Sequence, residues 1–171
     1  MKKQKWFDKK FRFELSQDDY ESVLSRLVKN PERIADLVAS LPVTALTKKF
    51  DNAWSIQENV GHLIDLEELH TGRIDDFIAG KEILRPADLN NRKTDEANHN
   101  GKNINELLNQ LKLVRKNFVK RMKYLDQKVL TRSSIHPRLN QPMRPIDMAQ
   151  FVLEHDEHHI ETIKEIINKY S

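Results

Sequence analysis

The sequence predicts an all-α protein built as a four-helix bundle, and three observations support this fold class. Glycine and proline are scarce, with 4 and 6 among 171 residues, whereas a β-sandwich or barrel needs many turn residues. Four long stretches carry apolar residues at helical spacing. Two long polar connections separate the last three stretches, which suits an up-down-down-up order. The length suits a single domain spanning residues 1–171.

The first predicted helix follows Ser16, a suitable N-cap with acidic residues after it. Pro31 interrupts this stretch, so the sequence leaves open two short helices or one kinked helix. The second predicted helix begins after Ser55, has Glu58 at the capping-box spacing, and has a suitable end at Gly80. Before the first helix, we expect an irregular or extended arm whose basic residues are solvated.

The other two predicted helices each follow a long polar loop. Residues 81–101 form the first loop, a feature that is uncommon in compact domains and is often functional. The third helix covers residues 103–125, with its apolar residues on one face. Residues 127–144 form the second loop, and Pro145 fits the first position of the last helix.

The composition excludes several kinds of site. The chain has no cysteine, which excludes disulfides, iron–sulfur clusters, thiolate zinc sites and a cysteine nucleophile. Net charge is only +3 and both signs are mixed along the chain, which argues against a nucleic-acid partner. No apolar run reaches the ~18 residues of a membrane span, and the N-terminus lacks the apolar core of a signal peptide. We therefore expect a cytoplasmic protein with no membrane partner.

The last predicted helix contains the stretch EHDEHHI at residues 154–160. On a helical wheel, with about 100° per residue, His155 and His159 fall inside the apolar stripe. His158 lies beyond its edge. Two imidazoles one turn apart can bind the same metal, and neutral imidazole suits Zn, Ni, Cu or Fe. The alternative is a pair of hydrogen-bonded core histidines, and this helix alone leaves both interpretations open.

A catalytic mononuclear site usually takes three protein ligands, and the second predicted helix offers further candidates. His62 lies at the edge of its apolar face, whereas His70 and Glu67 lie more centrally. The pattern does not choose between the two histidines. Glu67 has three interpretations, as a metal ligand, as a carboxylate that orients a ligating imidazole, or as the salt-bridge partner of an arginine.

Two motifs occur in order along the chain, W-S-x-x-E-x-x-x-H-L in WSIQENVGHLIDLEELHTGRIDDF and E-H-D-x-H-H in HPRLNQPMRPIDMAQFVLEHDEHHIETI. This combination resembles the DinB/YfiT-like superfamily, and DinB_2-type members in particular. The resemblance extends over most of the chain. It implies a four-helix bundle with up-down-down-up topology that commonly forms a homodimer.

The resemblance also implies a metal site. The family's ligands are a histidine that precedes leucine on the second helix and an H-x-x-x-H pair on the last, which correspond here to His62, His155 and His159. The family binds Zn or Ni there and keeps water in the open positions. Related proteins include thiol S-transferases that use bacillithiol or mycothiol, and maleylpyruvate isomerases. Others are described as metal-dependent hydrolases with no assigned activity.

These observations predict a Zn- or Ni-dependent enzyme that acts on a small-molecule substrate as a hydrolase or a thiol S-transferase. A transferase would need a low-molecular-weight thiol as cosubstrate, because the chain has no cysteine. Asp65, Glu67 or Asp156 is expected to act as a base, and His136 or His70 to orient the substrate. Two alternatives are a non-catalytic bundle stabilised by its metal and an interaction module that binds through the basic N-terminal arm.

Overall fold

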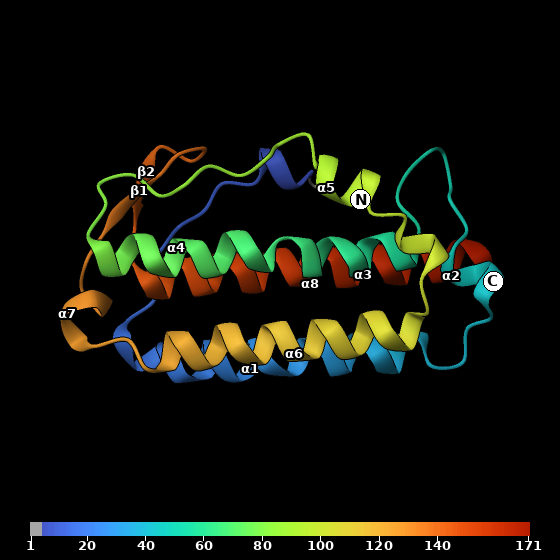
Figure 1. Cartoon of the computed structure of the whole chain (residues 1–171), viewed down its shortest axis with the longest axis horizontal. Coiled ribbons are helices and arrows are strands. Elements are labelled where there is room, and N and C mark those ends of the chain that lie inside the picture. The colour runs from blue at the N-terminus through green and yellow to red at the C-terminus, as the bar shows by residue number, and fades with distance from the viewer. Residues whose placement is uncertain (1–4) are drawn as a thin grey trace.

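The computed structural model, which describes residues 5–171, is a four-helix bundle (Figure 1). Its long helices are α1 (Tyr20–Val38), the nearly continuous pair α3 (Ile56–Asp65) and α4 (Glu67–Ala79), α6 (Ile104–Lys123) and α8 (Pro145–Tyr170). Helices α1 and α8 run in one direction, and α3, α4 and α6 run in the other (Figure 1). The predicted up-down-down-up topology is therefore confirmed.

Local sequence signals place most helix ends. The Ser55 hydroxyl accepts a hydrogen bond from the Glu58 amide at 3.1 Å, and the Glu58 carboxylate accepts one from the Ser55 amide at 2.8 Å. Gly80 ends α4 in the left-handed region at φ 68°, where glycine has no steric penalty. Leu66, between α3 and α4, keeps right-handed helical backbone angles, so the predicted second helix continues through it. The first helix also continues through Pro31 as a single element.

Both connections that the sequence predicted as loops contain secondary structure. The isolated bridge Ile83–Ile135 joins the two connections, which explains why neither is a free loop. The antiparallel hairpin pairs Ser134 with Met143. The short elements after α1 are α2 (Val43–Leu46), α5 (Arg92–Glu96), a 3₁₀ turn (His99–Gly101), α7 (Gln127–Leu130), β1 (Ser134–His136) and β2 (Gln141–Met143).

The described part of the N-terminal arm is irregular apart from one short turn, and its basic residues Lys5, Lys10 and Arg12 are exposed, as expected; its aromatic residues, in addition, pack on the bundle. Its 3₁₀ turn (Trp6–Asp8) lies on the α3, α4 and α8 side of the bundle (Figure 1). The Trp6 and Phe11 rings contact Phe151 of α8 at centroid distances of 5.2 and 4.9 Å. Aromatic packing of this kind fixes the arm on the bundle while the basic side chains around it remain exposed. Residues 1–4 lie outside the described part of the arm.

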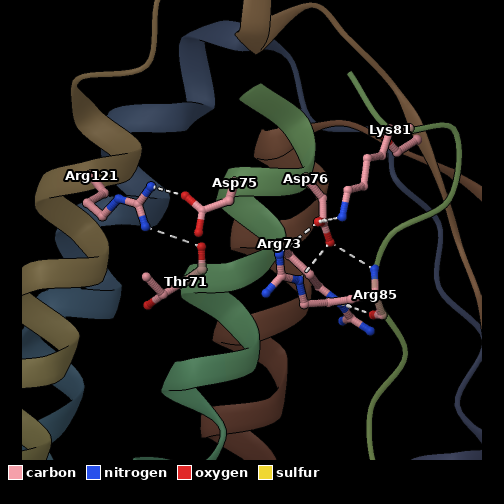
Figure 2. Close-up of polar contacts among 8 residues, drawn as sticks. Thr71, Arg73, Asp75, Asp76, Lys81, Arg85 and Arg121 are labelled. Carbon is pink, nitrogen blue, oxygen red and sulfur yellow. Dashed lines mark hydrogen bonds and ion pairs between the residues drawn. The ribbon is translucent and has the colours of Figure 1, made fainter. Parts of the chain in front are cut away.

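The connection after α4 is held by a carboxylate. Asp76 accepts hydrogen bonds from the Arg85 amide and guanidinium at 2.9 Å and pairs with Lys81 at 2.9 Å. Its neighbour Asp75 points to the other side of α4, where it pairs with Arg121 of α6 at 2.6 Å (Figure 2). The buried Asp76 therefore fixes the start of the segment that crosses over the bundle.

The apolar core consists of two clusters separated by a layer of buried polar residues. One cluster surrounds Phe77, Phe118 and Val152, and the other surrounds Ile34, Leu111 and Ile163. Each long helix contributes at least one buried polar residue between the clusters: Asn30, Glu67, His70, Arg115, His155, Asp156 and His159. Within the described residues, no helix has the length and apolar character needed to cross a membrane.

Candidate metal centre

Three buried histidines converge from two helices. His62 of α3 and His155 and His159 of α8 each present a ring nitrogen, and these nitrogens all lie within 4.8 Å of one another. The Nε2 atoms of His155 and His159 are 3.2 Å apart. Two nitrogens bound to one tetrahedral Zn at ordinary bond lengths lie about 3.3 Å apart. The structure therefore brings together the three residues that the family resemblance implied as ligands.

A chain of hydrogen bonds fixes the tautomer of His62. The Thr94 hydroxyl donates to the Asp65 carboxylate at 2.9 Å, so toward His62, at 3.0 Å from Nδ1, it acts as the acceptor. His62 therefore carries its proton on Nδ1 and leaves the Nε2 lone pair free. His99 binds the same Asp65 oxygen at 2.8 Å, and its ring packs where a Cβ on Gly61 would stand, at 2.2 Å.

Asn59 fixes the tautomer of His159 in the same way. The Asn59 amide nitrogen donates to the Ser55 carbonyl at 2.7 Å, which turns its carbonyl oxygen toward His159 Nδ1 at 2.7 Å. His159 Nδ1 is then the donor, and its Nε2 is free. A carbonyl or carboxylate partner that orients an imidazole in this way is typical of metal-ligating histidine.

The protonation of the cluster suits metal binding. Burial lowers the pKa of His62 from 6.5 to about 4. Burial also holds the pKa of His155 well below its ordinary value, and the neighbouring imidazole of His159 adds to the effect. The Nδ1 atom of His155 is buried without a hydrogen-bond partner among the described residues. These neutral rings with converging Nε2 atoms fit a divalent metal, because a metal binds neutral imidazole.

Both tryptophans of the chain flank this cluster. The Trp54 ring lies 4.6 Å from the His62 ring, and Trp6 of the arm lies 4.8 Å from the His155 ring in an edge-on arrangement. Trp54 Nε1 donates to Asp95 of α5 at 2.9 Å. The two indoles therefore cover the cluster with apolar surface and join it to the crossing segments.

A cavity of about 530 Å³ opens beside the three histidines. Its wall is formed by α3, α4 and α8, and its cover by the N-terminal arm and the two connections. Apolar side chains such as Leu66, Leu69 and Phe151 line it, together with His70 and His136. A volume of this size accommodates a small organic molecule.

The three carboxylates predicted as candidate bases, Asp65, Glu67 and Asp156, do not line the cavity. Glu67 and Asp156 both contact the buried Arg115 guanidinium, at 3.1 and 2.8 Å, and Asn30 donates to Asp156 at 3.0 Å. Burial opposes ionisation of Glu67, but Arg115 and His70 outweigh it and lower its pKa. Burial raises the pKa of Asp156 to about 6. Of the three interpretations of Glu67, the structure shows the salt bridge to an arginine.

His136, one of the two histidines predicted to orient a substrate, does line the cavity. It lies at the end of β1, where the Leu139 amide donates to its Nδ1 at 3.2 Å and Arg73 Nη1 lies 3.2 Å from its Nε2. Burial, reinforced by the positive charge of Arg73, lowers its pKa to about 3. His136 is therefore a neutral ring. His70, the other histidine considered as a ligand, contacts Glu67 at 3.3 Å and is not part of the three-histidine cluster.

The comparisons with known proteins agree with this geometry. A family model of the DinB superfamily matches residues 26–163. The chain belongs to the DinB superfamily. The sequence matches no curated protein. Among solved structures, this DinB protein is similar to YfiT from Bacillus subtilis, with a TM-score of 0.81 and 18% identity over 95% of this chain and 93% of that chain.

YfiT is described as a probable metal-dependent hydrolase with an unusual four-helix bundle topology. This DinB chain is also similar to a mycothiol-dependent maleylpyruvate isomerase, with a TM-score of 0.65 and 8% identity. That match covers 82% of this chain and 59% of the isomerase chain. At these identities the two structures establish the shared fold.

Sequence reasoning missed the residues that orient the ligands. Asn59 had a detectable signal, because it is a polar residue on the apolar face of the second predicted helix. Thr94 and Trp6 had none, since each reaches the site from a segment without helical periodicity. Their roles depend on how the crossing segments fold over the bundle.

Proposed function

We propose that this protein is a metal-dependent enzyme that holds Zn or Ni through His62, His155 and His159 and hydrolyses a small organic substrate. One observation carries the proposal: oriented imidazole nitrogens converge at the wall of a cavity large enough for such a substrate. Among the described residues, no aspartate, glutamate or further histidine joins the three as a fourth ligand. Three protein ligands with an open position are typical of catalytic sites, whereas structural sites are closed.

Each part of the chain around the site has a distinct role in this proposal. Bound there, a divalent metal would supply a Lewis acid that activates water near neutral pH. Thr94 and Asn59 keep the ring protons of His62 and His159 on Nδ1, away from the metal position. Trp6 and Trp54 exclude bulk water from the cluster.

The proposal gives the other predicted residues different roles. His136 lines the cavity as a neutral imidazole, which suits it to orienting the substrate. Glu67 and Asp156 take no part in contacting the substrate, because neither lines the cavity and Arg115 holds both carboxylates. They determine how α4 and α8, which carry the site, are held together.

Thiol transfer is the second candidate function. The structurally similar isomerase is mycothiol-dependent, and this chain has no cysteine of its own, so a thiol would come from a cosubstrate. Hydrolysis needs only water. Incubation of the metal-loaded protein with electrophilic substrates, with and without a low-molecular-weight thiol, separates the two functions by whether thiol is consumed. The homodimer implied by the family resemblance stays a prediction.

Metal content is the first test of this proposal. We expect tag-free protein, incubated with Zn or Ni and dialysed, to retain about one metal ion per chain by plasma mass spectrometry. The double variant His155→Ala/His159→Ala should retain almost none. His158→Ala is the matched control, because it removes an imidazole from the same helix turn and leaves the cluster intact.

The possible results are distinct. Loss of metal in the double variant and retention in His158→Ala support the site. A wild-type protein that retains neither Zn nor Ni would make the three histidines core residues and would overturn the proposal. A loaded protein whose metal has no exchangeable coordination position would favour the non-catalytic, metal-stabilised bundle instead.

A further inference from the structure

Arg73 is a buried cation with no paired carboxylate. It lies on α4 with 2% of its surface exposed, and no aspartate or glutamate oxygen lies within 4 Å of it among the described residues. Its Nε donates to the Arg85 carbonyl at 3.1 Å, and Nη1 contacts His136. The nearby Asp76 carboxylate is already bound by Arg85 and Lys81 (Figure 2). Buried arginines are almost always paired, so Arg73 calls for a further partner.

A second arginine without a paired carboxylate, the half-buried Arg138, lies near the same histidine. Arg138, in the turn between β1 and β2, lies over the rings of Phe7 and Phe151, at 5.2 and 5.9 Å from their centroids. Its Nη2 is buried without a hydrogen-bond partner among the described residues. The aromatic rings therefore hold this guanidinium in place and leave its N–H groups available.

Both arginines line the cavity at one end. Burial lowers the pKa of Arg73 to about 10; the Asp76 charge opposes this shift, and the positive charge of Arg138 adds to it. Of the acids that line the cavity, Asp88 accepts hydrogen bonds from the Asn90 and Arg92 amides. The other, Glu165, lies beyond the histidine cluster along α8. The arginine end of the cavity is therefore built for a negative charge that the described residues do not supply.

The spacing along α3 and α4 defines the shape of a ligand for this end. Arg73 follows His62 by three helical turns, roughly 16 Å along the axis, and its long side chain shortens that separation. Leu66 and Leu69 line the cavity between them. A ligand that reaches from the histidines to the arginines is elongated, with an apolar middle.

We propose that Arg73 and Arg138 bind the terminal oxyanion, carboxylate or phosphate, of an elongated substrate whose reacting bond lies at the histidine cluster. The planar guanidinium matches both kinds of oxyanion. Arg73 retains at least three N–H groups beyond its hydrogen bond to Arg85 and its contact with His136, which is enough for a two-point contact. This assignment rests on the proposed function and defines the substrate class.

Two matched probes test the proposal on the Zn-loaded protein. The monohydroxamate of octanedioic acid carries a metal-binding group at one end and a carboxylate at the other, and octanohydroxamic acid lacks the carboxylate. Titration calorimetry should show the carboxylate probe binding at least about tenfold more tightly. A phosphonate analogue distinguishes the two oxyanions by which terminal group binds more tightly.

Variants test which residues cause the tighter binding of the carboxylate probe. In Arg138→Gln and in Arg73→Gln, the two hydroxamates should bind within about twofold of each other. Lys169→Gln is the matched control, because it removes a cation that lines the opposite end of the cavity, and it should keep the full difference. Arg138 makes no hydrogen bond among the described residues, so Arg138→Gln tests the site even if Arg73→Gln misfolds.

The outcomes separate this proposal from the metal site. Equal binding of both hydroxamates to wild-type protein, or a difference that survives in Arg138→Gln, overturns the arginine site and leaves the metal proposal standing. If neither hydroxamate binds, octanoate and octanamide are titrated into the same protein. Octanoate binding that is lost in Arg138→Gln then supports the arginine site without the metal, and no octanoate binding overturns it.

Discussion

Two buried polar clusters meet on the same turn of α8, and they differ in whether their nitrogen and oxygen atoms face the cavity or the interior of the bundle. His155 faces the cavity with His62 and His159, whereas Asp156, the next residue, faces Arg115 inside the bundle. In the histidine cluster, the Nδ1 atoms of His62 and His159 point outward to oxygen acceptors, and burial lowers the pKa of His62 and of His155. The Arg115 cluster is an ionic contact between α4, α6 and α8, with a hydrogen bond from α1.

This difference separates a functional cluster from a structural one. In the Arg115 cluster, each carboxylate is bound by the arginine, and neither carboxylate lines the cavity. In the histidine cluster, one ring nitrogen of each histidine converges beside open volume. Burial alone does not distinguish the two, because all six side chains are buried. The two clusters differ in direction: the converging ring nitrogens of the histidines face the cavity, whereas the carboxylates face Arg115 inside the bundle.

Removal of the central cation should have the largest effect on stability. Arg115→Met leaves two buried carboxylates without their cation, and we expect the free energy of unfolding to fall by about 3–5 kcal/mol. Urea unfolding at neutral pH measures this loss. Metal content per folded chain should stay the same, because none of the three histidines contacts Arg115.

The triple variant Arg115→Met/Glu67→Gln/Asp156→Asn is the control for this prediction. It removes the uncompensated charges together with the cation, so most of the lost stability should return. If Arg115→Met were as stable as wild type, the ion pairs of Arg115 would make no net contribution to stability. If it lost metal while remaining folded, the separation between the two clusters would be wrong.

The neighbouring residues Asp75 and Asp76 allow a buried carboxylate in an ion pair to be compared with an exposed one on the same helix (Figure 2). Asp76 is fully buried and bound by Arg85 and Lys81, whereas Asp75 pairs with Arg121 at the surface. We expect Asp76→Asn to lower the unfolding free energy by about 2 kcal/mol, since its cations are partly exposed. Asp75→Asn, the matched control, should cost less than about 1 kcal/mol.

The dependence on pH follows from the direction of the Asp76 shift. Hydrogen bonds from Arg85 hold the pKa of Asp76 well below its usual range. A lowered native pKa stabilises the protein above the unfolded-state value, about 3.9, and the contribution is lost as the pH falls toward the native value. The gap between wild type and Asp76→Asn should therefore be constant from neutral pH to about 4 and narrow below it. A gap that widened in acid would contradict this assignment.

The sequence predicted the elements whose signals are local. Helical periodicity and the caps at Ser55 and Gly80 predicted the four long helices and their order. The position of His155 and His159 on the apolar stripe predicted that both would be buried, which is confirmed. Choosing His62 over His70 needed the family resemblance, because both are buried and differ only in which neighbouring helix they face.

Features that depend on distant segments were not predictable from one chain. In the sequence, nothing distinguishes Arg115 from the other charged residues of its helix. Only tertiary packing places it between Glu67 and Asp156. The unpaired state of Arg73 and Arg138 is likewise a property of the folded neighbourhood. The basic composition of the N-terminal arm predicted its exposed residues, but the packing of Trp6 against His155 depends on the fold and was not predicted.

The smallest expected effect concerns the hydrogen bond that orients the His62 ring, and it tests whether this orientation contributes to Zn affinity. Thr94→Val removes the acceptor of the His62 ring proton without changing any of the three histidines. Loss of such a partner should weaken Zn affinity by about tenfold, which competition against a chromophoric chelator measures. Thr94→Ser keeps the hydroxyl and should bind Zn as wild type does. Equal affinity in Thr94→Val would mean that packing against Trp54 alone orients His62. A loss that Thr94→Ser restores would show that α5 contributes to the metal site through one hydroxyl group.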